Sequence, residues 1–191
     1  MEKGKIIFLN GVSGAGKTTL AAALQEKSEE IFFAFGADTF VFMCPKKYIN
    51  YEPESEAVIY KAVSIMPQTV KLFSDMGYNI IIDHVLSEHG AYEFIKPLHD
   101  YPVLFVHVIC PVEELRRREI ERGDRKIGQA EEQLSTLYPQ NTYDLTVDTF
   151  HNSTEECADK IMALIDYPEK FTAFKTLWAK RGKDFLKKDC N

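Results

Sequence analysis

Residues 5–19 read KIIFLNGVSGAGKTT, and this stretch decides the fold. Its consecutive apolar residues, IIFL, are typical of a strand that is buried on both faces of a parallel sheet. The residues that follow fit the pattern G-x-x-x-x-G-K-[ST], and the next segment, TLAAALQEK, is rich in good helix formers. A strand, a glycine-rich turn and a helix in this order predict a phosphate-binding loop.

The residue types of this loop suit a nucleoside triphosphate. Glycines let the backbone curl, so that successive N–H groups converge on phosphate oxygens at the positive end of the following helix. Lys17 can reach the terminal phosphates, and the Thr18 hydroxyl can ligate Mg²⁺. The alternative is a glycine turn that binds nothing. We expect the nucleotide to be bound by Gly11, Ser13, Gly14, Ala15, Gly16, Lys17, Thr18 and Thr19.

Length and composition limit the other classes of function. The 191 residues suit one domain, and 45% hydrophobic with 27% charged residues is ordinary for a globular protein. The net charge of −6 argues against nucleic acid as the main partner, because no basic excess is available to release counterions. Four scattered cysteines without a C-x-x-C pair suggest reduced thiols. The N-terminal apolar run is too short for a signal peptide, and no stretch approaches the roughly 20 apolar residues of a membrane span. We therefore expect a cytoplasmic protein with no membrane partner.

Short apolar runs alternate with helical patterns, which is typical of a parallel sheet wrapped by crossover helices. The sequence thus predicts a three-layer α/β/α fold with a parallel five-stranded sheet, formed by one domain over residues 1–191 with a C-terminal helical extension over about 166–191. Pro67 is expected to kink the helix predicted over Glu54–Met76. The predicted strands lie near Ile6–Leu9, Ile31–Phe35, Asn79–Asp83, Val103–Cys110 and Asp144–Asp148. The predicted helices after the loop helix are Glu54–Met76, Ser87–His99, Pro111–Arg122, Ser153–Ile165 and Phe171–Lys188.

Two carboxylates follow predicted strands. Asp83 ends the apolar run NIIID, and ligands of open α/β sheets bind at the carboxyl ends of the strands. Asp83 could therefore hold a water of the Mg²⁺ shell, or simply cap the next helix. Asp38 follows the second strand, where a kinase benefits from a carboxylate that accepts a hydrogen bond from the acceptor hydroxyl. Its alternative is a turn aspartate that bonds its own backbone.

A basic cluster follows the fourth strand. Arg122 and Arg125 flank a glycine at a helix end, so a mobile lid could bring their guanidinium groups onto the transferring phosphate. Arg117 and Arg118 each stand four residues after a glutamate, which favours ion pairs along the helix.

Two further features stay open on sequence alone. His84 follows Asp83 and could face the site, and the aromatic-rich segment Phe40–Tyr51 could either wall an apolar acceptor pocket or belong to the core.

Five motifs follow one another along the chain: IIFLNGVSGAGKTT, FFAFGADTF, NIIIDHVL, HVICPVEELRRREIERGDRKIGQA and YDLTVDTFHNSTEECADKI. Taken in order, they resemble the chloramphenicol phosphotransferase-like family of P-loop kinases, up to about Ile165. The resemblance implies a P-loop nucleoside-triphosphate hydrolase fold with a lid, and transfer of the γ-phosphate of ATP to a hydroxyl of a small molecule. By this likeness Asp38 matches the carboxylate that activates the hydroxyl, Lys17 and Thr18 match the phosphate and Mg²⁺ ligands, and Arg125 lies in the lid.

The sequence therefore favours an ATP- and Mg²⁺-dependent kinase with a small-molecule hydroxyl acceptor and an unknown oligomeric state. The segment between Asp38 and the third strand looks shorter than in the antibiotic kinase, so the acceptor stays open. A nucleoside, a sugar or a sugar-nucleotide are alternative acceptors. A nucleotide-dependent switch with slow hydrolysis is a different class of function, although the chain has no guanine-reading N-K-x-D motif.

Overall fold

The computed structural model describes residues 2–49, 52–88, 90–123, 127–139 and 141–188, of which 181–188 are described by their backbone. Five parallel strands form one sheet in the order β2-β3-β1-β4-β5. The predicted parallel five-stranded sheet is thus confirmed. Its strands are β1 (Ile6–Asn10), β2 (Phe32–Gly36), β3 (Asn79–His84), β4 (Val103–Ile109) and β5 (Leu145–Asp148).

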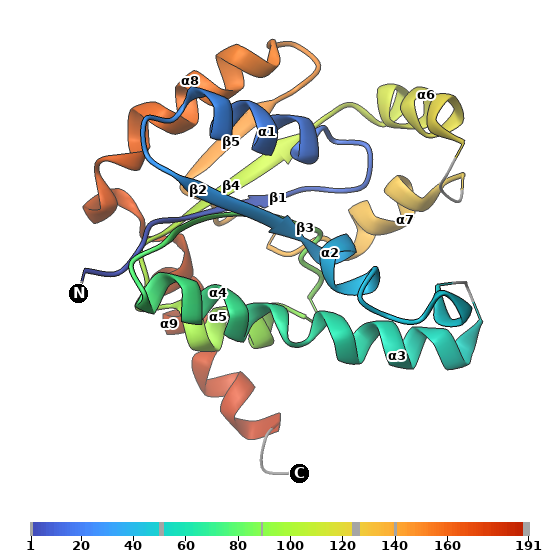
Figure 1. Ribbon diagram of the computed structural model, residues 1–191, viewed down its shortest axis with the longest axis horizontal. Helices are drawn as coiled ribbons and strands as arrows, with labels where there is room; N and C mark the ends of the chain where they lie inside the picture. Colours follow the sequence, from blue (N-terminus) through green and yellow to red (C-terminus); the bar gives the residue numbers. More distant parts are fainter. Residues whose placement is uncertain (1, 50–51, 89, 124–126, 140, 189–191) are drawn as a thin grey trace.

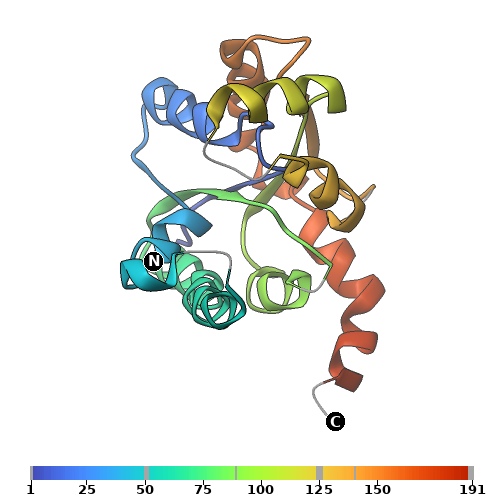
Figure 2. The same cartoon turned by 90° about the vertical axis from the view of Figure 1, so that its right-hand side faces the viewer.

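Helices cover both faces of the sheet and complete the three layers (Figures 1 and 2). Helices α1 and α8 lie on one face, and α4, α5 and α9 lie on the other. Helices α6 and α7 lie beyond the ends of the strands, at the right of Figure 1. The helical segments are α1 (Lys17–Lys27), α2 (Ala37–Val41), η1 (Lys46–Tyr48), α3 (Pro53–Val63), α4 (Met66–Asp75), α5 (Ala91–Leu98), α6 (Val112–Arg122), α7 (Gln129–Thr136), α8 (Thr154–Ile165), η2 (Pro168–Lys170) and α9 (Ala173–Lys188).

The helices depart from the sequence-based prediction in four places. The single kinked helix expected over Glu54–Met76 is wrong, because α3 and α4 are separate helices. Pro67 lies in the first turn of α4, where its missing N–H and fixed φ start a helix rather than bend one. The helix expected from Ser87 begins only at Ala91. The short helices α2 and α7 were not predicted.

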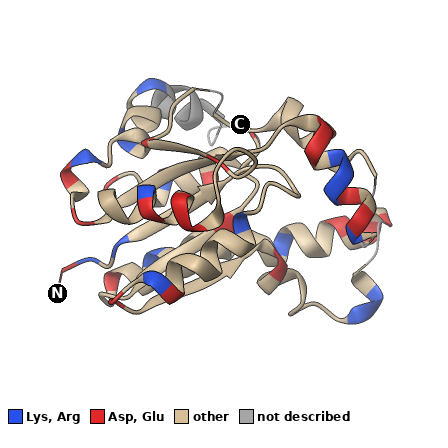
Figure 3. Cartoon of the chain, turned by 90° about the horizontal axis from the view of Figure 1, so that it is seen from above, with Lys and Arg blue, Asp and Glu red and all other residues tan. Residues whose placement is uncertain are grey.

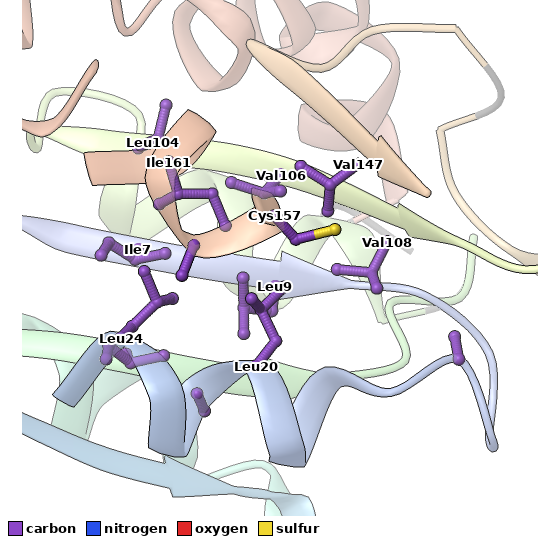
Figure 4. Close-up of a cluster of buried hydrophobic side chains, with 14 of the residues drawn as sticks. Ile7, Leu9, Leu20, Leu24, Leu104, Val106, Val108, Val147, Cys157 and Ile161 are labelled. Carbon is purple, nitrogen blue, oxygen red and sulfur yellow. The ribbon is translucent and has the colours of Figure 1, made fainter. Parts of the chain in front are cut away.

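The central strands separate two apolar cores. Ile7 and Leu9 pack with α1 and α8 (Figure 4), while Ile6 and Phe8 pack with the helices of the opposite face. This alternation follows from the period of two in strand side chains. Phe174 of α9 packs against Phe8, with ring centroids 5.7 Å apart, so the predicted C-terminal helical segment contributes to the second core.

The surface carries charges of both signs. Figure 3 shows Lys and Arg interspersed with Asp and Glu over the helices, and several of these side chains form ion pairs, such as Lys71–Asp75. Within the described residues, no helix has the length and apolar character required to cross a membrane.

Candidate active site

The turn between β1 and α1 has the backbone shape of an anion-binding loop. Gly14 and Gly16 adopt φ values of 77° and 87°, in the left-handed region that favours glycine. The carbonyl oxygen of Gly14 accepts a hydrogen bond from Arg118, and that of Ala15 accepts one from Thr149. Because side chains from other elements bind these two carbonyl groups, the loop is held in one shape before any ligand arrives.

A cavity of about 1100 Å³ opens beside this loop, at the carboxyl ends of the strands. Gly11 and Ala15 do not line it. A Cβ at Gly11 would lie 2.3 Å from the carbonyl oxygen of Val108, so Gly11 permits close packing on β4, and the Ala15 side chain is buried in the core. The other predicted nucleotide-binding residues do line the cavity, namely Ser13, Gly14, Gly16, Lys17, Thr18 and Thr19.

Lys17, Thr18 and Asp83 meet at the base of the cavity. Asp83 is paired in register with Leu9, just before the loop, and accepts a hydrogen bond of 2.5 Å from the Thr18 hydroxyl. The Lys17 ammonium lies 3.6 Å from Asp83 and donates to the Val12 carbonyl at 3.0 Å. A hydroxyl and a carboxylate in contact are hard oxygen donors of the kind that Mg²⁺ prefers, so this pair fits a Mg²⁺ site. The role itself stays a prediction.

Asp38 lines the same cavity. It is in the first turn of α2, and its side chain is exposed. Gly36, two residues earlier, pairs with Asp83 in the sheet, and a Cβ there would lie 2.5 Å from the Asp83 carbonyl oxygen. This close contact between β2 and β3 brings Asp38 and Asp83 to one cavity, as the sequence analysis expected for both strand ends.

The aromatic segment after Asp38 divides between core and surface. Phe40 is buried in the core, whereas Phe42 and Met43 are 70% and 74% exposed. None of these three is among the described residues that line the cavity.

Two arginines of α6 line the same cavity. Arg122 is the last residue of the helix and is exposed, and Arg125 lies outside the described residues. Arg118 forms the expected ion pair with Glu114, but it also donates to the carbonyl oxygens of Gly14 and Thr149. The sequence reasoning missed this second role, because spacing along a helix shows only the intrahelical partner.

His84 also lines the cavity. Its ring packs on Phe94, with centroids 4.8 Å apart, and Nδ1 is buried without a hydrogen-bond partner among the described residues. Burial, followed by the nearby Lys17 charge, lowers the pKa of His84 to about 4, so the imidazole is neutral at physiological pH.

Helix α7 was missed by sequence reasoning, and it brings two glutamines to the cavity. Gln129 and Gln133 lie one turn apart, and the Gln133 side chain contacts the phosphate loop directly. The signal available in the sequence was Gly128 followed by good helix formers in QAEEQLST.

The parallel sheet has a glycine-rich loop after its first strand, and a lysine and an aspartate lie together in one cavity. These features are those of the P-loop kinase class. Solved kinases share this fold. The Mycobacterium tuberculosis APS kinase CysC, in complex with AMPPNP and APS, aligns with a TM-score of 0.64 and 19% identity over 87% of this chain and 99% of that chain. Shikimate kinase from Acinetobacter baumannii, in complex with shikimate, aligns with a TM-score of 0.65 and 20% identity over 86% and 94% of the two chains.

The chain belongs to the chloramphenicol phosphotransferase-like family, whose model matches residues 4–166. A Mycobacterium tuberculosis protein provisionally named an O-phosphotransferase is 28% identical over 184 residues, covering 84% of this chain and 82% of that protein. The chain is accordingly an enzyme that transfers a phosphoryl group to a hydroxyl.

Proposed function

We propose that this enzyme is an ATP- and Mg²⁺-dependent kinase that transfers the γ-phosphate to a hydroxyl of a small molecule. The observation that carries the proposal is the lining of one cavity by Lys17, Asp83 and Asp38. Lys17 starts α1 directly after the phosphate loop, Asp83 lies on β3, and Asp38 lies in the first turn of α2. An acceptor between Asp38 and the loop would have its hydroxyl facing the phosphate.

The chemistry requires few protein groups. Asp38 accepts a hydrogen bond from the acceptor hydroxyl. It then takes the hydroxyl proton while the hydroxyl oxygen forms a bond to the γ-phosphorus. The bond from that phosphorus to the β-phosphate oxygen breaks, and ADP leaves. Lys17 and Arg122, with Arg125 in the predicted lid, offset the charge on the transferring group, which is where most catalysis in this reaction arises. Mg²⁺, when bound by Thr18 and by a water on Asp83, supplies Lewis-acid stabilisation of the phosphate oxygens.

The acceptor is an alcohol whose identity the chain leaves open. Chloramphenicol, a nucleoside, a sugar and a sugar-nucleotide are all candidates, and the names of structural neighbours add APS and shikimate to the compounds worth testing. A nucleotide switch is the less favoured function, because an exposed carboxylate in the cavity of the phosphate loop suits an acceptor hydroxyl.

The test combines an acceptor screen with one substitution. ADP release with ATP and Mg²⁺ would be measured over a panel of these alcohols, and phosphorylated products would be identified by mass spectrometry. For the alcohol that reacts, Asp38→Asn should lower kcat by about 100-fold or more, the range expected for a general base. Its affinity for ATP should stay within about twofold, because the loop is unchanged.

The matched control is Asp100→Asn, which removes a carboxylate that is 74% exposed and does not line the cavity. Near-normal turnover in Asp38→Asn would show that Asp38 is not the base. ADP release that no alcohol stimulates would favour the switch.

A further inference from the structure

The phosphate loop is contacted by a side chain from a helix that lies far away in the sequence. The backbone N–H of Ser13 donates a hydrogen bond of 2.7 Å to Oε1 of Gln133, which is 120 residues further along the chain. Both residues line the cavity. Helix α7 is therefore attached to the loop itself rather than to the rim of the site.

This contact fixes which end of the Gln133 amide faces the loop. A backbone N–H can only donate, so the atom that it meets must be the amide oxygen. The other end of the amide, Nε2, carries two N–H donors. In the part of the chain that the structure describes, Nε2 forms no hydrogen bond.

The helix that carries Gln133 is held at both ends. At its start, the buried carboxylate of Glu119 accepts hydrogen bonds from the N–H groups of Gly128 and Ala130, at 2.9 and 2.7 Å. Just after its end, the Tyr138 carbonyl accepts a hydrogen bond of 2.8 Å from Nδ2 of Asn10, the last residue of β1. A side chain on such a fixed helix loses little additional freedom when it binds a ligand.

The neighbouring groups favour an anion as the partner of these donors. Helix α1 begins at Lys17 beside the cavity, so its first turn contributes backbone N–H groups, and the Lys17 side chain contributes an ammonium. Several donors that line one cavity can be satisfied together by the oxygens of a phosphate.

We propose that Gln133 is a ligand of the terminal phosphate: its Oε1 stays on Ser13 N–H while its Nε2 donates to an oxygen of the γ-phosphate. The inference rests on the proposed function, since it needs a triphosphate in the loop. Gln133 would then give the enzyme a means to distinguish ATP from ADP, because ADP lacks the phosphate that Nε2 contacts.

The substitution Gln133→Glu separates this role from simple docking of α7. A carboxylate still accepts the Ser13 hydrogen bond, so the contact between helix and loop is retained. It offers no N–H donor and adds a negative charge beside the phosphate. Gln133→Leu removes both contacts. Gln68→Glu, at an exposed position of α4 outside the cavity, is the matched control for charge.

The measurement is the Kd of Mg²⁺-AMPPNP and of ADP for the full chain by isothermal titration calorimetry, with thermal melting as a check of folding. Gln133→Glu should weaken AMPPNP by about tenfold or more, as for loss of a charge-assisted hydrogen bond, and ADP by less than about twofold. Gln68→Glu should match the original protein for both nucleotides.

Three results would overturn the proposal. In the first, Gln133→Glu binds AMPPNP as the original protein does, which would leave Gln133 a docking residue only. In the second, both nucleotides weaken equally, which would exclude a contact specific to the terminal phosphate. In the third, the original protein binds neither nucleotide, and this result alone would also refute the proposed function.

Discussion

Glu119 offers a direct test of how α7 is held beside the phosphate loop. Its side chain is 3% exposed, and its carboxylate accepts the two hydrogen bonds from Gly128 and Ala130. Glu119→Ala removes both bonds and leaves two helix N-terminal N–H groups without their partner. At about 1.5–3 kcal/mol for each hydrogen bond to a charged group, the gross loss is about 3–6 kcal/mol.

The net effect is smaller for two reasons. Water can hydrate the Gly128 N–H, which is only part-buried, and the variant no longer buries a carboxylate. We therefore expect a net destabilisation of about 2–3 kcal/mol. For a domain of this size, that corresponds to a fall in Tm of about 4–12 °C.

The assay is urea unfolding together with amide hydrogen exchange. If α7 opens locally before the domain unfolds, exchange at Ala130 should accelerate more than exchange in the β1 strand. Glu169→Ala, at an exposed position of η2, should change stability by less than about 0.5 kcal/mol. A Glu119→Ala variant with unchanged Tm and unchanged exchange at Ala130 would refute the reasoning that this carboxylate anchors the helix.

Two other predictions follow from the walls of the cavity. Gly36→Ala would place a Cβ 2.5 Å from the Asp83 carbonyl oxygen, so β2 must shift and displace Asp38. We expect kcat for the reacting alcohol to fall by about tenfold or more, with a smaller change in ATP affinity. A normal kcat in steady-state kinetics would contradict this expectation. The pKa of His84 is lowered to about 4 in the folded protein, whereas an unfolded chain has the usual value of 6.5. Between these two pH values the unfolded chain binds the proton and the folded protein does not. The free energy of unfolding should therefore decrease as the pH falls from 6.5 towards 4. Unfolding curves across this range should show a weaker pH dependence in His84→Phe, and an NMR titration that gave His84 a pKa near 6.5 would refute the assignment.

The sheet could be predicted from the sequence because its signals are local. Four of the five strands contain an apolar run, and the loop after β1 has its own pattern, so the fold and the phosphate loop could be predicted together. The region from Glu54 to Met76 was predicted less well, because a proline within a helical pattern can either kink one helix or start another. Which of these occurs depends on packing, and a single sequence does not contain that information.

The site could be predicted only in part, because several of its contacts join residues that are far apart in the sequence. Strand ends gave Asp38 and Asp83, since parallel strands bring their carboxyl ends to one edge. No local pattern marks Gln133 as a neighbour of Ser13, or Asn10 as a neighbour of Tyr138, because the residues of each pair come from different elements. The proposed lid residue Arg125 lies outside the described residues, so its role stays a prediction.

These distant contacts explain why the phosphate loop is ready to bind an anion. Arg118 is bonded to the Gly14 carbonyl, Thr149 to the Ala15 carbonyl and Lys17 to the Val12 carbonyl, so the protein itself satisfies these oxygens. Two N–H groups of the loop are bonded within the protein as well, because Ala15 N–H donates to the Val12 carbonyl and Ser13 N–H donates to Gln133. These bonds hold the loop in one shape. The helix start adds its own unsatisfied donors. The glycine-rich pattern makes this shape possible, and the side chains of α6 and of the segment after β5 hold it in place.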